Sequence, residues 1–385
     1  MQKGKNTKLY KKTIQRVFDE IKETFPFNNK GSFLEFEKTF NSYYKKLEKI
    51  ENDKDFFILL QKFVRELDNS HTKIGKYPGR KFFKPRNYIV EKIEKKYYLK
   101  KKDDIVGEII LIDNKTPKKI LNEWLKIMPK NRAERYFLLT GYGKGSVVVK
   151  YKDKGKTKKL ELKKEKIVIP PREKEKLIGA GIINKKIGYL KIKHWSSSKS
   201  DTNFVDKKID YFVRNKIKAL VIDVRGNLGG DSKTARHLTG HFIDKEIHVG
   251  TYKRRASEDN FKLKATKGYW QPRKPYLDIP IYVLIDELGF SSNEIFIAAL
   301  KDNKIATLIG EKTEGGSGNP KKIEIPFRKK HFELFVSTWI NCRKNGKIIE
   351  GNGINPHIKF FNTLKDIKEK KDKVLERALI EIKKH

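Results

Sequence analysis

The stretch from Ile281 to Leu300, IYVLIDELGFSSNEIFIAAL, constrains the fold of this chain more than any other. Its first five residues form a short apolar run, which is typical of a buried parallel strand. Gly289 and two serines follow, and apolar residues then return at helical spacing. The stretch predicts a strand, a tight turn and a helix, the arrangement of a nucleophile elbow. A serine at this position can also simply cap the helix, so both interpretations stay open at this point.

The residues around this stretch alternate between strand and helix patterns. Strands are predicted at residues 187–192, 219–224 and 306–309, and helices at residues 204–215 and 232–242. This alternation predicts a mostly parallel sheet with ligands at the carboxyl ends of its strands. Two loops with suitable polar groups leave such ends, DVRGNLGG and GFSSNE. We therefore expect an α/β domain over residues 175–385.

The first part of the chain is helical in pattern. Residues 1–72 contain three runs with apolar residues at helical spacing, broken at Pro26, and the third begins near Asn52 or Asp53. Their aromatic stripe is more typical of a core than of a ligand site. The module ends in LDNSHT, which places Ser70 and His71 beside each other beyond a helix. By itself, a Ser-His pair in this position is more typical of an ordinary polar turn, and it becomes a candidate base only if another part of the chain needs one.

The pattern then changes to short strands over residues 80–170. Strands are predicted at residues 97–99, 108–112, 146–151 and 158–162, with one helix at residues 117–128. Pro170 and Pro171, followed by the charged run to Lys176, predict a linker to the α/β domain.

The net charge of +41 would favour anionic partners. However, lysine and arginine occur in every segment, and no basic and aromatic nucleic-acid motif stands out. We therefore expect no nucleic-acid partner. Binding to a polyanion remains the alternative, and it would weaken steeply with salt.

The sequence gives little reason to expect a metal or cofactor. A single cysteine, Cys342, excludes an intramolecular disulfide framework and a multi-cysteine zinc site. His237 and His241 are four residues apart on a predicted helix but lack the glutamate of HExxH, so we interpret them as surface or core histidines. No run of about 18 apolar residues predicts a transmembrane helix. The chain as given is expected to be soluble and cytoplasmic, or extracytoplasmic if a signal peptide was removed before residue 1.

Five motifs together resemble peptidase family S41. They are IGYLKI, ALVIDVRGNLGG, SSNEIFIAALKD, IGEKTEGG and IEGNGINPHI, in this order. The family includes the C-terminal processing (tail-specific) proteases, the tricorn core protease and the interphotoreceptor retinoid-binding protein repeats. The resemblance implies a parallel sheet of the crotonase and ClpP type. The run VGEIILIDNKTP also resembles a PDZ domain, although no clear carboxylate-binding loop is found near Gly75 to Gly79.

Two positions indicate the branch of the family that this chain resembles. The processing proteases carry a catalytic lysine in GExTxGK, and here that position holds Gly316. The tricorn-like branch instead uses a Ser-His pair and a glutamate, which match Ser70, His71 and Glu350. The resemblance therefore implies a histidine-dependent serine peptidase without a cofactor.

The resemblance also implies a role for each site residue. Ser291 is expected to be the nucleophile, because it precedes Glu294 by three residues as in the family motif SxxE. His71 is expected to be the general base, oriented by Glu350 through Ser70. The oxyanion is expected to bind the N–H of Ser292 and that of Gly229 or Gly230. The substrate would be a peptide or an unfolded protein, with recognition of its C-terminus as one option. The alternative is an inactive binding protein of the same fold.

Overall fold

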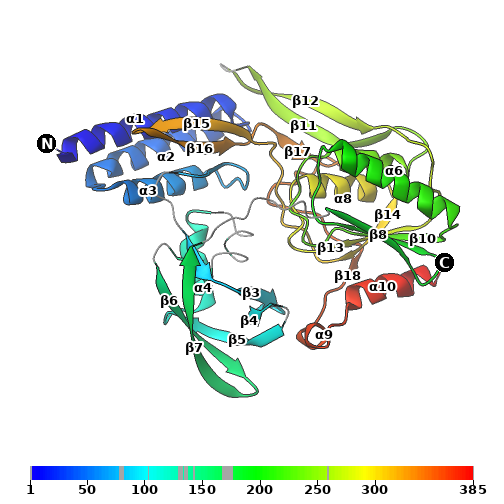
Figure 1. Ribbon diagram of the computed structural model, residues 1–385. Helices are drawn as coiled ribbons and strands as arrows, with labels where there is room; N and C mark the ends of the chain where they lie inside the picture. Colours follow the sequence, from blue (N-terminus) through cyan, green and yellow to red (C-terminus); the bar gives the residue numbers. More distant parts are fainter. Residues whose placement is uncertain are drawn as a thin grey trace. The chain divides into compact units, whose positions relative to one another are not determined.

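The computed structural model describes residues 2–77, 82–102, 104–128, 133, 138–141, 144–166, 177–257 and 260–384 (Figure 1). The chain divides into two compact units. Unit 1 consists of Met1–Glu173, Pro320–Val336 and Thr363–Lys370, and unit 2 of Lys174–Asn319, Ser337–Asn362 and Lys371–His385. The predicted linker from Pro170 to Lys176 lies outside the described residues.

A six-stranded sheet forms the centre of unit 2. Its order is β18-β14-β13-β10-β9-β8, and every neighbouring pair is parallel except β8 and β9. The strands are β8 (Ile178–Ile183), β9 (Ile187–Ile192), β10 (Ala219–Asp223), β13 (Ile281–Ile285), β14 (Ala306–Gly310) and β18 (Ile358–Lys359). The predicted mostly parallel α/β fold is therefore confirmed. All residues of β10 and β13 are buried, which explains why both strands are apolar except for Asp223 at the end of β10.

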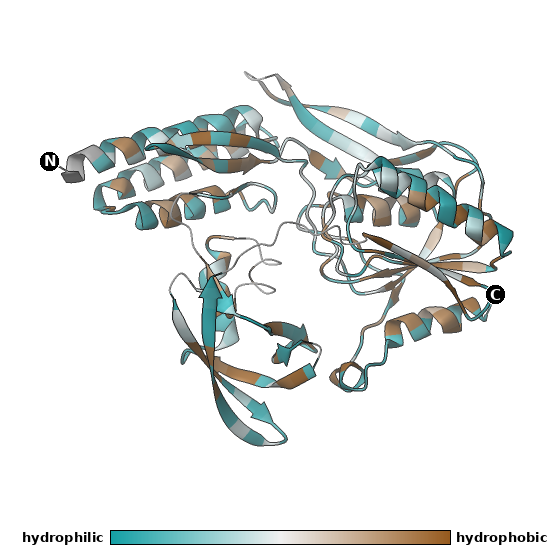
Figure 2. Ribbon diagram, in the orientation of Figure 1, coloured by the Kyte–Doolittle hydropathy of each residue, from teal (hydrophilic) through white to brown (hydrophobic). Residues whose placement is uncertain are grey.

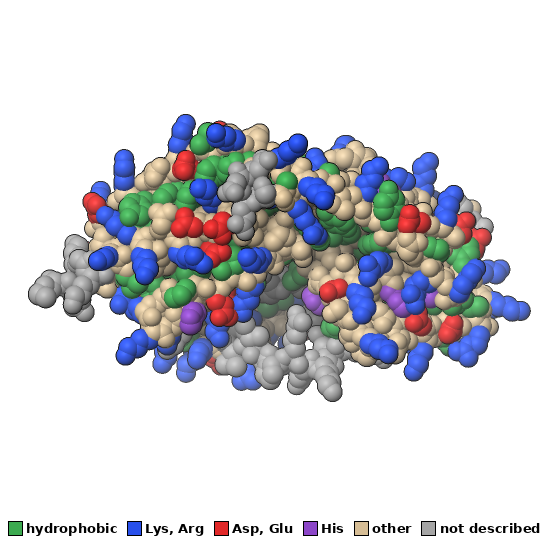
Figure 3. Space-filling model, turned by 90° about the horizontal axis from the view of Figure 1, so that it is seen from above, with side chains coloured by type: hydrophobic (Ala, Val, Ile, Leu, Met, Phe, Trp, Pro, Cys, Tyr) green, Lys and Arg blue, Asp and Glu red, His purple; other side chains and the backbone are tan. Residues whose placement is uncertain are grey.

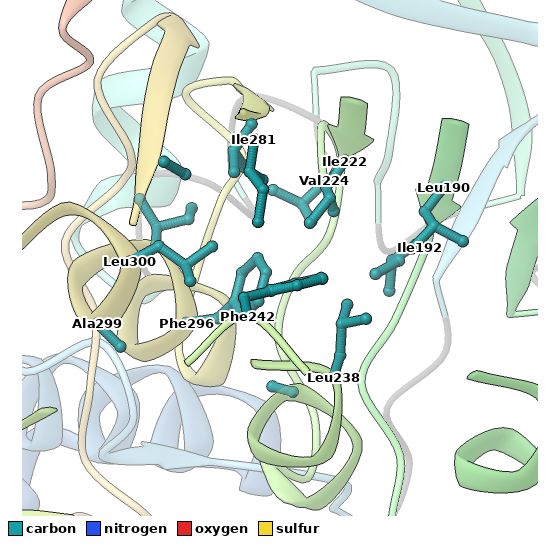
Figure 4. Close-up of a cluster of buried hydrophobic side chains, with 14 of the residues drawn as sticks. Leu190, Ile192, Ile222, Val224, Leu238, Phe242, Ile281, Phe296, Ala299 and Leu300 are labelled. Atoms are coloured by element: carbon teal, nitrogen blue, oxygen red, sulfur yellow. The ribbon is translucent and has the colours of Figure 1, made fainter. Parts of the chain in front are cut away.

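Helices α6 (Lys199–Arg214), α7 (Lys233–Gly240), α8 (Ser292–Asp302) and α10 (Lys373–Ile382) complete the α/β part of unit 2. Phe296 and Leu300 of α8 and Leu238 of α7 belong to one buried cluster with residues of β9, β10 and β13 (Figure 4). Burial of such side chains contributes about 1.5–3 kcal/mol each. This cluster fixes α8, and with it the turn that precedes the helix, to the central strands.

A second sheet of unit 2 was not predicted from the sequence. It contains β11 (Ile247–Ser257), β12 (Asn260–Trp270) and β17 (Ile340–Cys342), all antiparallel. The long β11–β12 hairpin is mostly hydrophilic, whereas the strands of the parallel sheet are mostly hydrophobic (Figure 2). Apolar residues alternate with lysine only over residues 261–265 of the hairpin, which is too short a pattern to predict both strands.

Unit 1 contains the three predicted helices, α1 (Gln2–Thr24), α2 (Lys30–Lys46) and α3 (Asp53–Arg65), and a short 3₁₀ turn (Leu47–Lys49). The Asn52 side chain caps α3, as expected. The aromatic residues of the helices are buried, apart from the half-buried Tyr44, which confirms their interpretation as core.

A hairpin from much later in the chain packs against these helices. Strands β15 (Lys321–Phe327) and β16 (Lys330–Val336) form a three-stranded sheet with β1 (Lys73–Ile74). Phe327 stacks on Phe56 of α3, with ring centroids 5.6 Å apart, and Phe56 stacks on Tyr10 of α1 at 4.5 Å. The N-terminal module thus obtains part of its core from residues 320–336, which the sequence did not predict.

The rest of unit 1 is an antiparallel sheet of order β2-β7-β6-β5-β4-β3 with one helix. Its elements are β2 (Phe83–Pro85), β3 (Tyr88–Ile93), β4 (Lys96–Lys101), β5 (Asp104–Ile112), α4 (Pro117–Leu125), β6 (Gly145–Asp153) and β7 (Lys156–Lys166), and a short helix α9 (Leu364–Lys368) also belongs to this unit. Each strand predicted between residues 97 and 162 is present. The likeness to a PDZ domain stays a prediction, and Gly79 lies outside the described residues.

Lysine and arginine side chains are spread over the face of the molecule seen in Figure 3, with acidic side chains between them. On this face they do not gather into one basic patch. Among the described residues, no helix has both the length and the apolar character needed to cross a membrane.

Candidate active site

Ser291 occupies a sharp turn between β13 and α8. Its backbone has φ 60° and ψ −128°, a strained region for a residue with a side chain. The Ser291 N–H donates to the Gly316 carbonyl at 2.8 Å, and the Ser291 carbonyl accepts from the Glu294 N–H at 2.8 Å. Although Ser291 is the N-cap residue, its side chain makes no capping hydrogen bond. The hydroxyl is thus not used to cap the helix, which was the simpler interpretation of this serine.

The neighbouring Ser292 has a different environment. Its side chain is buried, and its Oγ has no hydrogen-bond partner among the described residues. Ser291, by contrast, is partly exposed. A nucleophile must be reached by its substrate, so the environment of Ser291 suits this role better.

Gly229 and Gly230 lie at the end of the loop that follows β10. A methyl group on Gly229 would lie 2.7 Å from both the Phe290 carbonyl oxygen and the Ser291 Cβ, so only glycine permits this close approach. The Gly229 N–H donates to Asn227 Oδ1 at 2.8 Å and is therefore occupied. Within the described residues, no acceptor is found for the N–H of Gly230 or of Ser292. Of the two glycines expected to bind an oxyanion, Gly230 has the available donor.

Glu294 organises the loop on the other side of Ser291. It is fully buried and accepts from Thr313 Oγ1 at 2.5 Å, the Gly315 N–H at 2.9 Å and the Gly316 N–H at 2.6 Å. Burial raises the pKa of Glu294 to about 8, although these three donors act in the opposite direction. Since the Gly316 carbonyl holds the Ser291 N–H, Glu294 positions Ser291 through this loop.

Glu350 lies next to the same loop. Its Oε2 accepts from the Ser317 N–H at 2.8 Å, one residue beyond the partner of Ser291. The following backbone is tied to the loop as well, because the Gly351 N–H donates to the Gly315 carbonyl at 2.8 Å. The structure therefore attaches Ser291 and Glu350 to consecutive residues, Gly316 and Ser317.

We expect Glu294→Gln to impair both stability and activity. Glutamine replaces one acceptor oxygen by an NH2 group, which leaves a buried donor without a partner at a cost of about 1–3 kcal/mol. A displaced Gly316 would in turn misplace Ser291, and a shift of about 1 Å can cost roughly 100-fold in rate. Urea unfolding and kcat, measured beside Glu314→Gln in the same loop, test this role. Unchanged kcat in Glu294→Gln would contradict it.

The raised pKa of Glu294 also predicts how the stability of the protein depends on pH. The carboxyl has an ordinary pKa of 4.5 and a folded-state pKa of about 8, so the folded protein binds more protons between these values. The resulting stabilisation is complete below pH 4.5 and is lost as the pH rises through about 8. The free energy of unfolding of the wild type should therefore fall between pH 4.5 and about 8 because of Glu294. The Glu294→Gln variant should lack this contribution to the pH dependence.

An ion-pair network holds the loop after β10 to the C-terminal helix. Arg225 makes bidentate contacts with Asp223 and with Asp372 at the start of α10, at 2.6–2.9 Å. Asp223 also accepts from the Tyr189 hydroxyl at 2.8 Å and lies 2.9 Å from Lys191 Nζ. Burial alone would raise the pKa of Asp223, but Arg225 and Lys191 hold it at about 2.

Arg225→Met is expected to lower the free energy of unfolding by about 3 kcal/mol, because Asp223 is then a buried charge without its main partner. In the wild type, the stabilisation from the lowered pKa of Asp223 is complete above about pH 4 and is lost as the pH falls through about 2. Denaturant unfolding at neutral and acid pH measures both effects. Arg236→Met, at an exposed position of α7, is the control. Equal stability of the two variants would show that the network contributes little.

Asp286 has a similar positioning role that the sequence analysis missed. Its carboxylate accepts from the Gly226 N–H at 2.8 Å and from the Leu288 N–H at 3.2 Å, and so it joins the two loops at the carboxyl ends of β10 and β13. Burial raises the pKa of Asp286. An acidic residue at the carboxyl end of an apolar run was the available signal for both Asp223 and Asp286.

Ser70 and His71 lie in unit 1, between α3 and β1. His71 is buried, and Ser70 Oγ lies 3.4 Å from His71 Nδ1. Asn69 fixes the backbone here, because its Oδ1 accepts from the N–H groups of His71 at 3.1 Å and Thr72 at 2.8 Å. The predicted Ser-His pair is thus ordered by its own neighbours.

His237 and His241, expected to be surface or core histidines, are both withdrawn from solvent to some extent. His241 is fully buried and His237 is partly buried. Asp206 of α6 lies against both rings. The three side chains form a cluster of potential metal ligands in unit 2.

The fold and the serine turn are those of α/β proteins that carry a serine at a strand-to-helix turn. Comparisons with known proteins indicate the family. Residues 186–360 match the model of peptidase family S41. The carboxyl-terminal-processing peptidase 2, chloroplastic, of Arabidopsis thaliana is 29% identical over 161 residues, which cover 41% of this chain and 30% of the relative. The carboxy-terminal-processing protease of Bartonella bacilliformis is 32% identical over 174 residues, which cover 45% and 38%.

A solved structure of mature CPAF complexed with lactacystin is similar over nearly the whole chain. Its TM-score is 0.78 at 17% identity, with 98% of this chain and 99% of that chain covered. At this identity the likeness shows the fold. These comparisons identify residues 186–360 as a peptidase family S41 domain, and the chain spans less than half the length of the two relatives named above.

Proposed function

We propose that the protein is a serine peptidase that hydrolyses peptide bonds through an acyl-enzyme, with Ser291 as nucleophile. The observation that carries the proposal is the strained backbone of Ser291 at the turn between β13 and α8, with its hydroxyl not used as a cap. Strained residues of this kind persist where the surroundings hold them, and they cluster at active sites. The match of residues 186–360 to family S41 supports the same activity.

The oxyanion donors in this proposal are the N–H groups of Ser292 and Gly230. The Ser292 N–H belongs to the first turn of α8, where N–H groups have no intrahelical acceptor. The Gly230 N–H is available, whereas that of Gly229 is bonded to Asn227. Each donor that stabilises the negative oxygen contributes about 2.7–4 kcal/mol to catalysis.

The general base in this proposal is His71. With Nδ1–H donating to Ser70 Oγ, the Nε2 lone pair accepts the proton of Ser291 as Oγ attacks the carbonyl carbon. The C–N bond then breaks, and His71 gives this proton to the leaving amine. A water molecule, deprotonated by His71, releases the acyl group and restores Ser291. Glu350, acting through Ser70, orients His71 and stabilises its imidazolium form.

The histidine-dependent mechanism rests on residue 316 as well as on His71. Gly316 provides no side chain at the position where the processing proteases carry their lysine, and its N–H and carbonyl are bonded to Glu294 and Ser291. The substrate in this proposal is an unfolded protein or a peptide. The relatives are named for carboxyl-terminal processing, so we include C-terminal segments among the substrates to be tested.

Cleavage of an unstructured protein and of a mixed fluorogenic peptide set tests the proposed activity. Wild type is assayed with and without a chelator, beside Ser291→Ala. We expect turnover that the chelator does not change and that the substitution eliminates. Absence of turnover by wild type, together with retained peptide binding, would instead support an inactive binding protein of the same fold.

A further inference from the structure

Three side chains from two helices of unit 2 meet at one point outside the proposed active site. Asp206 lies on α6, His237 on α7, and His241 at the C-cap of α7. Asp206 Oδ1 is 2.6 Å from His237 Nε2 and 3.0 Å from His241 Nε2. All the potential ligand atoms lie within 4.8 Å of one another. The question is which positive centre, a proton or a metal ion, holds these three polar groups together.

The hydrogen-bond partners of His241 determine which ring nitrogen carries a proton. His241 Nδ1 lies 2.9 Å from the Pro275 carbonyl oxygen, which can only accept, so Nδ1 must be the N–H donor. In the neutral ring, Nε2 then has a lone pair that faces a carboxylate oxygen of Asp206, which also has no proton to give. Two acceptors at this distance require a positive centre between them, either a second proton or a metal ion.

The surroundings suit a metal ion. A histidine that binds metal through Nε2 usually donates its Nδ1–H to a carbonyl or carboxylate, as His241 does to Pro275. Tetrahedral zinc, with ligands at about 2.0–2.2 Å, places them about 3.3 Å apart. The two distances from Asp206 Oδ1 to the histidine nitrogens, 2.6 and 3.0 Å, are each within about 1 Å of this spacing. His241 is fully buried, but the Asp206 side chain is 38% exposed, which leaves a path for an ion and room for a water ligand.

The pKa of His237 is lowered by burial and by the charge of Arg273, while the hydrogen bond and charge of Asp206 act in the opposite direction. Burial lowers its pKa, which favours the neutral ring that metals bind. Arg273 also lowers this pKa by its charge, and the same charge would repel a cation. Removing the charge of Arg273 should therefore strengthen metal binding, while the ligands stay unchanged.

We propose that Asp206, His237 and His241 bind a divalent transition-metal ion of the zinc class. Two imidazoles and one carboxylate are ligands that zinc prefers, with water as the fourth. The ion would link α6 to α7, and α7 begins three residues after Gly230. Its role is to stabilise the helices behind the loop that carries this glycine. The proposed peptide hydrolysis does not require it.

Metal titration of the chelator-treated, dialysed protein tests the site. Zn²⁺ is expected to bind with one equivalent and to raise Tm by several degrees, because it binds the folded state. Co²⁺ should give the visible d–d absorption of a tetrahedral N and O site. Mg²⁺ should have no effect, since it prefers oxygen ligands.

Asp206→Asn and His237→Gln are the test variants, because His241 is too deeply buried to be replaced safely. Each should weaken Zn²⁺ binding by at least about tenfold. His248→Gln, at a histidine of unit 2 outside the cluster, should bind as wild type does. Equal Zn²⁺ binding by wild type and both test variants would overturn the proposal. So would the absence of saturable Zn²⁺ or Co²⁺ binding by wild type, which would assign a proton to the gap between His241 and Asp206.

Discussion

Ser291→Ala is expected to lower kcat by about a million-fold, the loss found when a serine nucleophile is removed from a catalytic unit. Stability should change by no more than about 0.5 kcal/mol. Alanine has the same Cβ as serine, so the strained backbone at φ 60° costs no more than before, and no capping bond is lost. Steady-state kinetics on a peptide substrate and urea unfolding measure the two effects.

Ser292→Ala is the matched control for this substitution. The Ser292 Oγ is buried and has no hydrogen-bond partner among the described residues, so its removal deletes no hydrogen bond there. The backbone N–H that we assign to the oxyanion remains. Activity should stay within a few-fold of wild type. If Ser292→Ala were inactive and Ser291→Ala active, the assignment of the two serines would be reversed.

His71→Ala is expected to lower kcat by about 10⁴-fold or more, because Ser291 then has no base to accept its proton. The local backbone should persist, since Asn69 still bonds the N–H groups of residues 71 and 72. Added imidazole should partly restore activity by occupying the space of the missing ring. Rates with and without imidazole test both statements.

His331→Ala is the control for the loss of His71. His331 is an exposed histidine on β16 of the same unit, and its replacement should change neither rate nor stability. Full activity of His71→Ala would exclude His71 as the base. A loss of activity that imidazole does not restore, together with a lowered Tm, would point to a structural role of the ring instead.

The sequence predicted the local structure well for strands that are buried along their whole length and for helices that bury one face. Strand β9 has the predicted bounds, and the serine turn lies between a strand and a helix as expected, because apolar runs and helical periodicity are local signals. The β11–β12 hairpin was missed, since its strands are rich in lysine and apolar alternation extends only over residues 261–265, FKLKA.

What the sequence could not predict depends on residues far apart in the chain. The hairpin of β15 and β16 packs against α1 and α3, which precede it by more than 200 residues. Similarly, the pair His237 and His241 looked ordinary until Asp206 was placed beside it. From the sequence, Gly229 and Gly230 were equally good candidates for the oxyanion donor. Only the hydrogen bond from the Gly229 N–H to Asn227 distinguishes them.

Glu294 illustrates the same limit within the site. In the sequence Glu294 was only the last residue of the SxxE motif. Its three hydrogen-bond donors, on Thr313, Gly315 and Gly316, are known only from the structure. The signal was an acidic residue on the face of a helix that is otherwise apolar. Such a residue must be paired, and its partners are found only in the folded chain.

Covalent labelling tests the central claim, the role of Ser291 as nucleophile, most directly. The protein is treated with a serine-directed fluorophosphonate, and the modified residue is located by peptide mass spectrometry. We predict one adduct per chain on Ser291, its loss in Ser291→Ala and in chemically unfolded protein, and its retention in Ser292→Ala. An adduct on Ser292, or no adduct on the folded wild type, would contradict the account.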